Sequence, residues 1–121
     1  LRPGESPALP CALQLAAPLP PPRLPRLPLH RHVGLERDAA GLAQALEIIS
    51  CVEKAGNGEA ALLNMVATAR LVTAAALARQ ETRGGHWRSD FPGTNAHGDR
   101  TFLTLAAAEA IAAPAHRHAV P

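Results

Sequence analysis

The stretch that decides the fold is residues 38–83, DAAGLAQALEIISCVEKAGNGEAALLNMVATARLVTAAALARQETR. Apolar side chains recur there at steps of three and four residues after Asp38, a residue type that caps helix N-termini well. We therefore expect a first helix with a buried face made of Leu42, Ala45, Leu46, Ile49 and Val52. Lys54 suits a helix C-terminus, and Gly56 can take the left-handed conformation that ends a helix.

A second helix is expected over residues 58–83, with Asn57 as its cap and with Gly84 and Gly85 ending it. The two helices would form an antiparallel hairpin. Between residues 60 and 78 the apolar residues are interrupted by only four polar ones, which are Asn64, Thr68, Arg70 and Thr73. Because this helix lacks a clean polar face, we expect it to be buried on more than one side, against a larger domain or another copy.

A short apolar run predicts a third helix over residues 101–113, with Thr101 or Thr104 as its cap and Pro114 as its end. The expected fold class is all-α. It is a small helical bundle, an antiparallel helical hairpin plus a short third helix, with a Pro-rich extended N-terminal leader. The expected organisation is a linker over 1–30, a helical domain over 31–113 and a disordered tail over 114–121.

The first 28 residues contain nine of the twelve prolines. A proline removes a backbone donor and pushes the residue before it toward extended geometry, so no helix is expected there. Residues 22–25 and 25–28 both read Pro-Arg-Leu-Pro, a P-x-x-P pattern with a basic residue that SH3-type domains bind. A peptide ligand and a plain linker are both open interpretations, and the linker is favoured.

The composition restricts the function classes. Twelve Arg and Lys oppose ten acids, for a net charge of +2 without a run of either sign, which does not predict nucleic-acid binding. Cys11 and Cys51 have no metal-site spacing, which favours a reduced, cytoplasmic protein. A membrane span over residues 60–78 is not expected, because Arg70 at its centre would cost about 2.5–3.5 kcal/mol. The chain opens on Leu1 without a signal-peptide pattern, and we expect an N-terminal truncation.

The densest group of reactive side chains follows the second helix: Glu81, Arg83, His86, Trp87, Arg88 and Asp90. A loop at a helix end can carry a binding site. The favoured alternative is structural: Arg79 and Arg83 satisfy the helix C-terminal carbonyls, and Asp90 pairs with a neighbouring arginine. Trp87 and Phe91 would then plug the open end of the hairpin. No catalytic set is evident in either case.

Arg70 is the other notable side chain. A buried guanidinium requires an acceptor, and none lies within one helical turn of Arg70. Its partner is expected outside this chain, unless the side chain reaches the edge of the bundle. The two H-x-H pairs, at residues 30–32 and 116–118, have no third ligand, so no metal site is predicted. Phosphate-loop, G-x-S-x-G and H-E-x-x-H motifs do not occur.

Three segments carry a resemblance to a known family: residues 32–42, residues 64–79, and residues 81–92, which read ETRGGHWRSDFP. Over roughly residues 30–105 the chain resembles the C-terminal domain of L-aspartate oxidases. The element E-[ST]-R-G-x-H…D-[FY]-P is typical of the wider family, which includes the succinate dehydrogenase and fumarate reductase flavoproteins. Those relatives usually read S-R-G-A-H and continue well beyond it, so the short continuation after Pro92 favours the oxidase.

The resemblance implies an FAD enzyme that oxidises L-aspartate to iminoaspartate and supplies quinolinate synthase in NAD biosynthesis. FAD and the catalytic residues belong to upstream domains of such enzymes, so this chain alone is expected to bind no cofactor and to be inactive. No catalytic, cofactor-binding or metal residue is assigned in it. Its helices are expected to pack on the flavin-binding domain, with candidate interface residues Arg70, Glu81, Arg83, Gly84, His86, Arg88 and Asp90.

Two alternatives stay open. The chain could instead belong to a succinate dehydrogenase or fumarate reductase flavoprotein, which its resemblance to the wider family allows. It could also be a free-standing helical interaction module, in which the hairpin self-associates and the P-x-x-P arm binds a partner.

Overall fold

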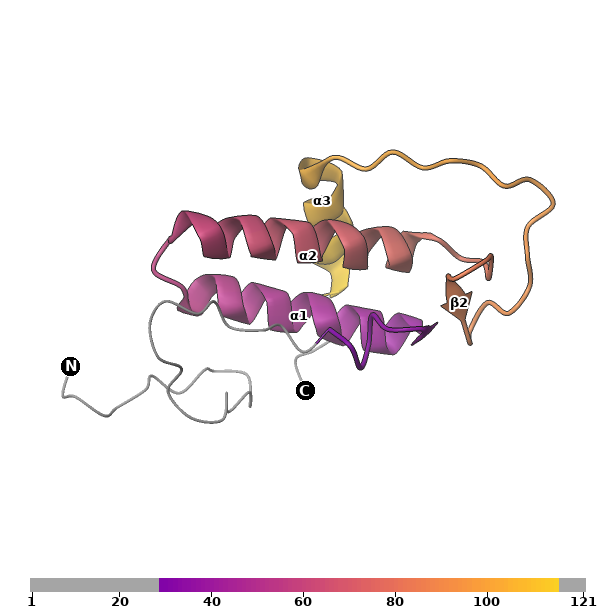
Figure 1. The fold of residues 1–121 in the computed structure, drawn as a ribbon, viewed down its shortest axis with the longest axis horizontal. Helices are drawn as coiled ribbons and strands as arrows, with labels where there is room; N and C mark the ends of the chain where they lie inside the picture. The colour runs from indigo at the N-terminus through magenta and orange to yellow at the C-terminus, as the bar shows by residue number, and fades with distance from the viewer. Residues whose placement is uncertain (1–28, 116–121) are drawn as a thin grey trace.

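Three helices and one short strand pair form residues 29–115, the part of the chain that the computed structural model describes (Figure 1). The elements are β1 (Glu36–Arg37), α1 (Ala39–Ala55), α2 (Ala60–Ala78), β2 (Trp87–Arg88) and α3 (Leu105–Ala115). The predicted class, a small helical bundle built on an antiparallel hairpin, is confirmed. The Pro-rich leader with its P-x-x-P pattern and the end of the predicted tail lie outside the described residues.

Helix α1 follows the sequence pattern closely. Its cap is Asp38, whose Oδ1 accepts a hydrogen bond from the Gly41 amide at 2.6 Å. All five residues of the predicted apolar face are buried: Leu42, Ala45, Leu46, Ile49 and Val52. The turn that follows differs from the expectation, because Gly56 has an extended backbone with φ −73° and Gly58 takes the left-handed conformation with φ 73°.

Helix α2 is shorter at both ends than predicted. Its capping position is Glu59, which makes no side-chain capping bond, and not Asn57. The helix ends at Ala78, five residues before Arg83. The physical reason lies in Arg88, whose guanidinium binds the last carbonyl oxygens of the helix. A further helical turn is therefore not needed to satisfy them.

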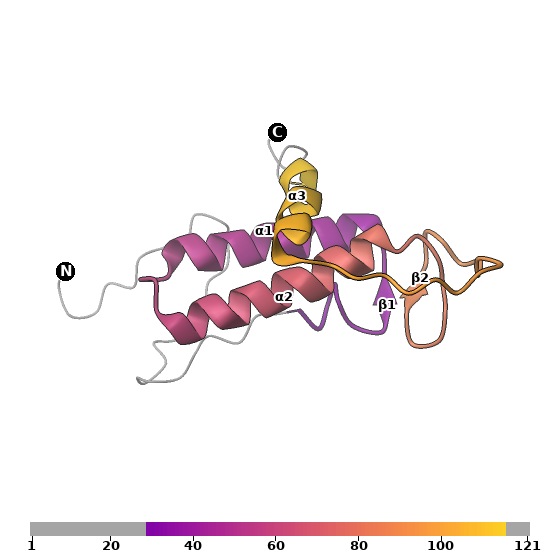
Figure 2. The same cartoon turned by 90° about the horizontal axis from the view of Figure 1, so that it is seen from above.

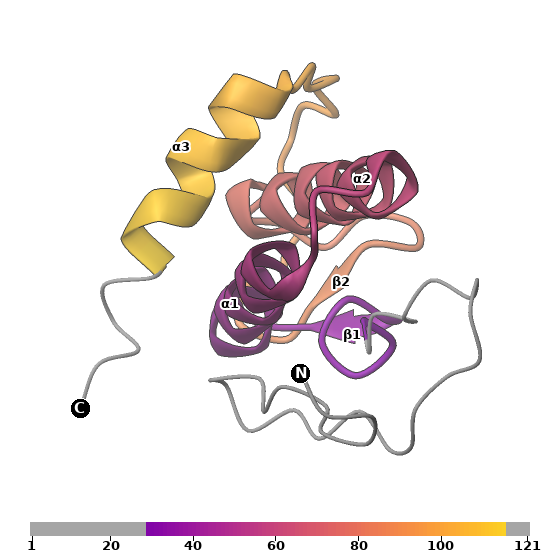
Figure 3. The same ribbon diagram turned by 90° about the vertical axis from the view of Figure 1, so that its left-hand side faces the viewer.

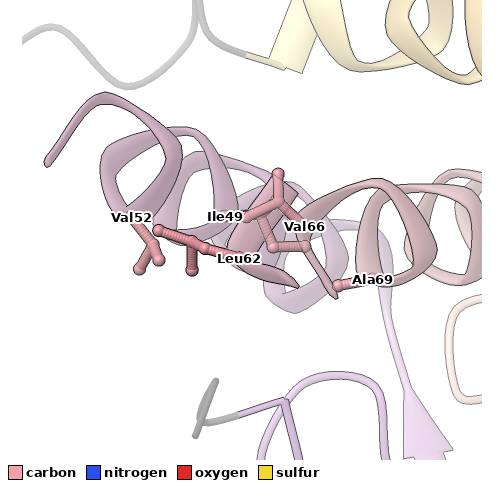
Figure 4. Close-up of a cluster of buried hydrophobic side chains, with 5 residues drawn as sticks. All are labelled: Ile49, Val52, Leu62, Val66 and Ala69. Atoms are coloured by element: carbon pink, nitrogen blue, oxygen red, sulfur yellow. The ribbon is translucent and has the colours of Figure 1, made fainter. Parts of the chain in front are cut away.

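The core lies between the helices in two clusters. One joins α1 and α2 around Ile49 and Val66 near the connecting turn, and Figure 4 shows its five side chains meeting between the two helices. The other joins all three helices through Leu46, Ala74, Ala108 and Ala112. Three of these four side chains are methyl groups, so the helices approach closely and each contact buries little apolar area.

Helix α3 crosses the hairpin on the face opposite to β1, as the view along the hairpin shows (Figure 3). Thr104 is its cap, with Oγ1 accepting from the Ala107 amide at 3.2 Å, which fits one of the two predicted caps. The helix continues through Pro114 to Ala115 and does not end before the proline. Only one further residue is helical after Pro114, so the proline interrupts little of the hydrogen-bond ladder.

The strand pair was not predicted. Strands β1 and β2 run parallel, with Glu36 opposite Trp87 and Arg37 opposite Arg88. They lie side by side at the end of the hairpin that is remote from the Gly56–Gly58 turn (Figure 2). This pairing brings the segment before α1 against the polar loop after α2.

We expect Leu46→Ala to lower the free energy of unfolding by about 2–5 kcal/mol, because it opens a cavity at a fully buried position that contacts α2 and α3. Urea unfolding followed by circular dichroism measures the change. Leu63→Ala is the control, since this α2 side chain is 42% exposed. Equal effects of the two substitutions would contradict the described core.

Candidate functional site

Six of the seven predicted interface residues meet at one place, in the loop that follows the C-terminal end of α2. They are Glu81, Arg83, Gly84, His86, Arg88 and Asp90. We call this group, with the residues that bind it, the helix-end junction. Arg70, the seventh, lies within α2 and pairs elsewhere.

Arg88 is the centre of the helix-end junction and is 1% exposed. Its Nη1 donates to the carbonyl oxygens of Ala76, Leu77 and Arg79 at 2.9, 3.0 and 3.3 Å. Its Nε and Nη2 each donate to one oxygen of Asp90 at 2.7 Å. The positive charge thus covers the C-terminal end of α2, where a cation opposes the helix dipole. The prediction that Arg79 and Arg83 would fill this role is wrong.

Asp90 connects the two helices. Besides binding Arg88, its Oδ2 accepts from the Ala39 amide, the first helical residue of α1, at 3.0 Å. The pKa of Asp90 is lowered from 3.8 to about 2, mainly by the hydrogen bond from Arg88; burial opposes this shift and the hydrogen bond from the Ala39 amide adds to it. The predicted pairing of Asp90 with a neighbouring arginine is confirmed, and it is bidentate.

Thr82, which the sequence did not single out, organises the loop. Its hydroxyl accepts from the Arg88 amide at 2.9 Å and lies 2.9 Å from the carbonyl oxygen of Phe91. Its backbone amide and carbonyl bind Gly93 and Thr94. The threonine occupies the [ST] position of the E-[ST]-R-G element, and the restriction of that position to a hydroxyl-bearing residue was the available signal of this role.

Glu81 is 4% exposed and holds the next part of the loop. It accepts from Arg79 at 2.9 Å, from Arg83 at 3.3 Å and from the Asn95 amide at 3.0 Å. Burial would raise the pKa of Glu81, but these donors outweigh it and the pKa lies below its ordinary value. The Arg83 guanidinium also donates to the Asn95 carbonyl oxygen at 2.6 Å.

A tight turn places His86. The backbones of Arg83 and His86 exchange hydrogen bonds at 2.9 and 3.0 Å across two glycines, and Gly84 has φ 58°, which favours glycine. The Nδ1 of His86 lies 2.8 Å from Nη1 of Arg37, which can only donate. Nδ1 is therefore the acceptor, and Nε2 carries the proton toward the Arg79 carbonyl oxygen at 3.1 Å. Arg37 is a second residue that the sequence did not reveal.

The predicted aromatic plug is wrong in part. Trp87 is 49% exposed and does not close the hairpin. Successive side chains of a strand point to opposite faces. Because Arg88 points toward the helices, Trp87 points away from them. Phe91 is half-buried and lies under the Arg88 guanidinium, with 5.0 Å between Cζ and the ring centroid, a cation–π contact.

Arg70 has its partner inside this chain, which corrects the expectation of an external one. It forms an ion pair with Glu53 of α1, and Nη1 lies 3.4 Å from Oε1. The hydrogen bond from Arg70 holds the pKa of Glu53 below its ordinary value. The Arg70 side chain is 8% exposed and that of Glu53 38% exposed, so the pair lies at the edge of the hairpin. Glu53 is one of only two acidic residues in α1, and this was the signal in the sequence that could have identified it as the partner of Arg70.

The contacts of the helix-end junction hold the loop in place. In residues 29–115 every buried side-chain nitrogen and oxygen has a hydrogen-bond partner, as is usual for buried polar groups. The same residues contain no group of three His, Cys, Asp or Glu side chains placed to hold a metal ion. The arrangement fixes a loop and presents Trp87 on its outer side.

A comparison with protein families assigns the chain to one of them. Residues 57–117, about half of the chain, match the family model described as the C-terminal region of the fumarate reductase flavoprotein. The matched range contains α2, the loop residues 81–90 of the helix-end junction, and α3. The chain belongs to this family.

Individual relatives show which members of this family the chain is similar to. The L-aspartate oxidase of Caulobacter vibrioides is 49% identical over 80 residues, which are 66% of this chain and 15% of the relative. The L-aspartate oxidase of Rhodospirillum rubrum is 43% identical over 103 residues, 78% of this chain and 35% of the relative. A fumarate reductase (CoM/CoB) polypeptide of Methanothermobacter marburgensis is 52% identical over 42 residues, 35% of this chain and 8% of the relative. No solved structure matches the chain.

The chain therefore spans a minor part of the length of these curated relatives, and its family match is to the C-terminal region of the flavoprotein. The predicted resemblance to the C-terminal domain of L-aspartate oxidases is confirmed by both kinds of comparison.

Arg88→Ala should lower the free energy of unfolding by about 3–5 kcal/mol, because it leaves Asp90 and three carbonyl oxygens without their donor. Arg88→Lys should recover only part of the loss, since an ammonium cannot make the bidentate contact. Urea unfolding measures both. Exposed Arg100 is the control, and Arg100→Ala should change stability by less than about 0.5 kcal/mol. Similar losses for Arg88 and Arg100 would refute the central role of Arg88.

Acid should weaken the helix-end junction through Asp90. Its folded-state pKa lies below the ordinary value, so its contribution to stability is complete above pH 3.8 and is lost as the pH falls toward about 2. Thermal unfolding midpoints measured across this range should fall less steeply for Asp90→Asn than for the unaltered chain. Glu53 and Glu81 also have lowered pKa values, so some acid sensitivity should remain. Parallel curves for the two proteins would contradict the assignment.

Proposed function

We propose that this chain is the C-terminal helical domain of an L-aspartate oxidase, the FAD enzyme that oxidises L-aspartate to iminoaspartate. The observation that carries the proposal is 43–49% identity to two proteins named L-aspartate oxidase, over 80 and 103 residues. A third protein of that name, from Agrobacterium fabrum, is 41% identical over 76 residues. The domain supports the enzyme by packing, and the product would pass to quinolinate synthase.

Packing on the flavin-binding domain is supported by what the surface exposes. Helix α2 contains a single charged residue, Arg70, and that residue is buried. Two large apolar side chains of α2 remain uncovered, since Val72 is 51% exposed and Leu63 is 42% exposed. Large apolar side chains left uncovered in this way are typical of a surface that another domain covers.

FAD would be bound by the rest of the enzyme. A dinucleotide site requires a strand, a glycine-rich turn and a helix whose N-terminus faces the pyrophosphate. The described residues have two strands of two residues each, and their Gly84-Gly85 turn follows a helix and leads into β2. They do not fit the cofactor, so we propose that this chain alone binds no FAD and has no activity.

A cytoplasmic location without a membrane span is part of the proposal. Helix α2 is long and apolar enough to cross a membrane, with a mean hydropathy of 1.6. Yet its central arginine pairs with Glu53, and its buried side chains form the core with α1 and α3. The helix is used as a core element, as in many soluble proteins.

A fumarate reductase or succinate dehydrogenase flavoprotein is the second candidate. It is favoured by the 52% identity to the Methanothermobacter protein, although that match covers only 35% of the chain. The wider family match is compatible with both candidates.

Substrate oxidation by the full-length flavoprotein that carries this chain separates the candidates. We expect FAD-dependent oxidation of L-aspartate, measured as consumption of oxygen or of fumarate, and no oxidation of succinate. The 121-residue chain alone, assayed with added FAD, is the control and should be inactive. Oxidation of succinate without oxidation of L-aspartate would overturn the proposal in favour of the second candidate.

A further inference from the structure

Trp87 combines a fixed backbone with an uncovered side chain. On one side of it, the backbone of His86 is bound to Arg83 and its ring to Arg37. On the other side, the buried Arg88 makes five side-chain hydrogen bonds, and the Ser89 amide donates to the Arg37 carbonyl oxygen at 2.9 Å. The only tryptophan of the chain is nevertheless 49% exposed.

The direction of the Trp87 side chain is set by the strand pair. Trp87 and Glu36 are register partners, as are Arg88 and Arg37, so the two pairs point to opposite faces. Arg88 occupies the inner face. The opposite face carries Trp87, and its side chain is 49% exposed there.

Such a tryptophan suits an interface anchor. Tryptophan is enriched among the residues that dominate binding energy. An anchor whose backbone is already immobilised loses little conformational entropy when a partner covers it. The helix-end junction therefore has a consequence outside this domain, because it holds Trp87 ready for contact.

The relatives indicate the partner. In the Caulobacter protein the matched residues make up 15% of the length, so most of that polypeptide lies outside the segment seen here. A domain in the same chain is present at high effective concentration, and a small surface centred on one aromatic side chain is then sufficient. We propose that Trp87 is an anchor that inserts into the flavin-binding part of the same polypeptide. This rests on the proposed function and adds the point of contact.

Hydroxyl-radical footprinting of the full-length flavoprotein, read by mass spectrometry, tests the proposal. The reference is the oxidation rate of tryptophan in a short unstructured peptide, scaled to the 49% exposure that Trp87 has in the described structure. We expect a several-fold slower oxidation of Trp87 in the full-length protein at concentrations where it is monomeric. An unchanged rate overturns the proposal. Protection that appears only when the protein dimerises also overturns it, since the partner would then be a second copy.

Variants provide the second measurement. In the full-length protein, Trp87→Ala should lower the temperature at which bound flavin becomes fluorescent, and Trp87→Phe should restore most of the loss. Phe102→Ala is the matched control, because it removes an exposed aromatic ring outside the helix-end junction and should leave that temperature unchanged. Equal shifts for Trp87→Ala and Phe102→Ala would count against a specific anchor.

The two proposals fail separately. A full-length protein that oxidises L-aspartate while Trp87 stays fully reactive refutes the anchor and leaves the proposed function intact. A protein that protects Trp87 but does not oxidise L-aspartate refutes the function and leaves the anchor intact.

Discussion

The bidentate pair between Arg88 and Asp90 holds two helix ends of opposite polarity together. Arg88 faces the carbonyl end of α2, and Asp90 faces the amide end of α1. Each charge is therefore balanced by a helix dipole as well as by its partner. This explains how a guanidinium that is 1% exposed is tolerated, since a buried charge requires its donors to be satisfied completely.

The features that the sequence predicted well are the local ones. The apolar period of α1 and its Asp38 cap depend on residues within four positions of each other, so the pattern named every buried residue of that helix. The end of α2 could not be predicted from local residues. Arg88, which lies ten residues beyond this end, binds the last carbonyl oxygens of the helix and so replaces a further helical turn. The strands β1 and β2 are two residues long, too short for a period, and their partner lies 51 positions away.

The site shows the same division. The family-like motif identified six residues that do meet, since a motif marks positions that act together. It did not identify Arg37, which enters the helix-end junction from the segment before α1, or Asn95, which lies three residues beyond the end of the motif. The prediction of an external partner for Arg70 was wrong because its partner, Glu53, lies on the facing helix. A search for acceptors within one turn of α2 could not find it. Tertiary contacts of charged side chains were the information that the sequence lacked.

The double attachment of Asp90 also controls the alignment of the two long helices along their axes. Sliding α1 by one helical turn against α2 would move Ala39 by about 5.4 Å, and the carboxylate could no longer reach both that amide and Arg88. Large buried side chains packed between α1 and α2, among them Ile49 and Val66, oppose such a slip near the connecting turn. Asp90 thus fixes the axial register of the two helices at the opposite end of the hairpin, where it binds the start of α1 and, through Arg88, the end of α2.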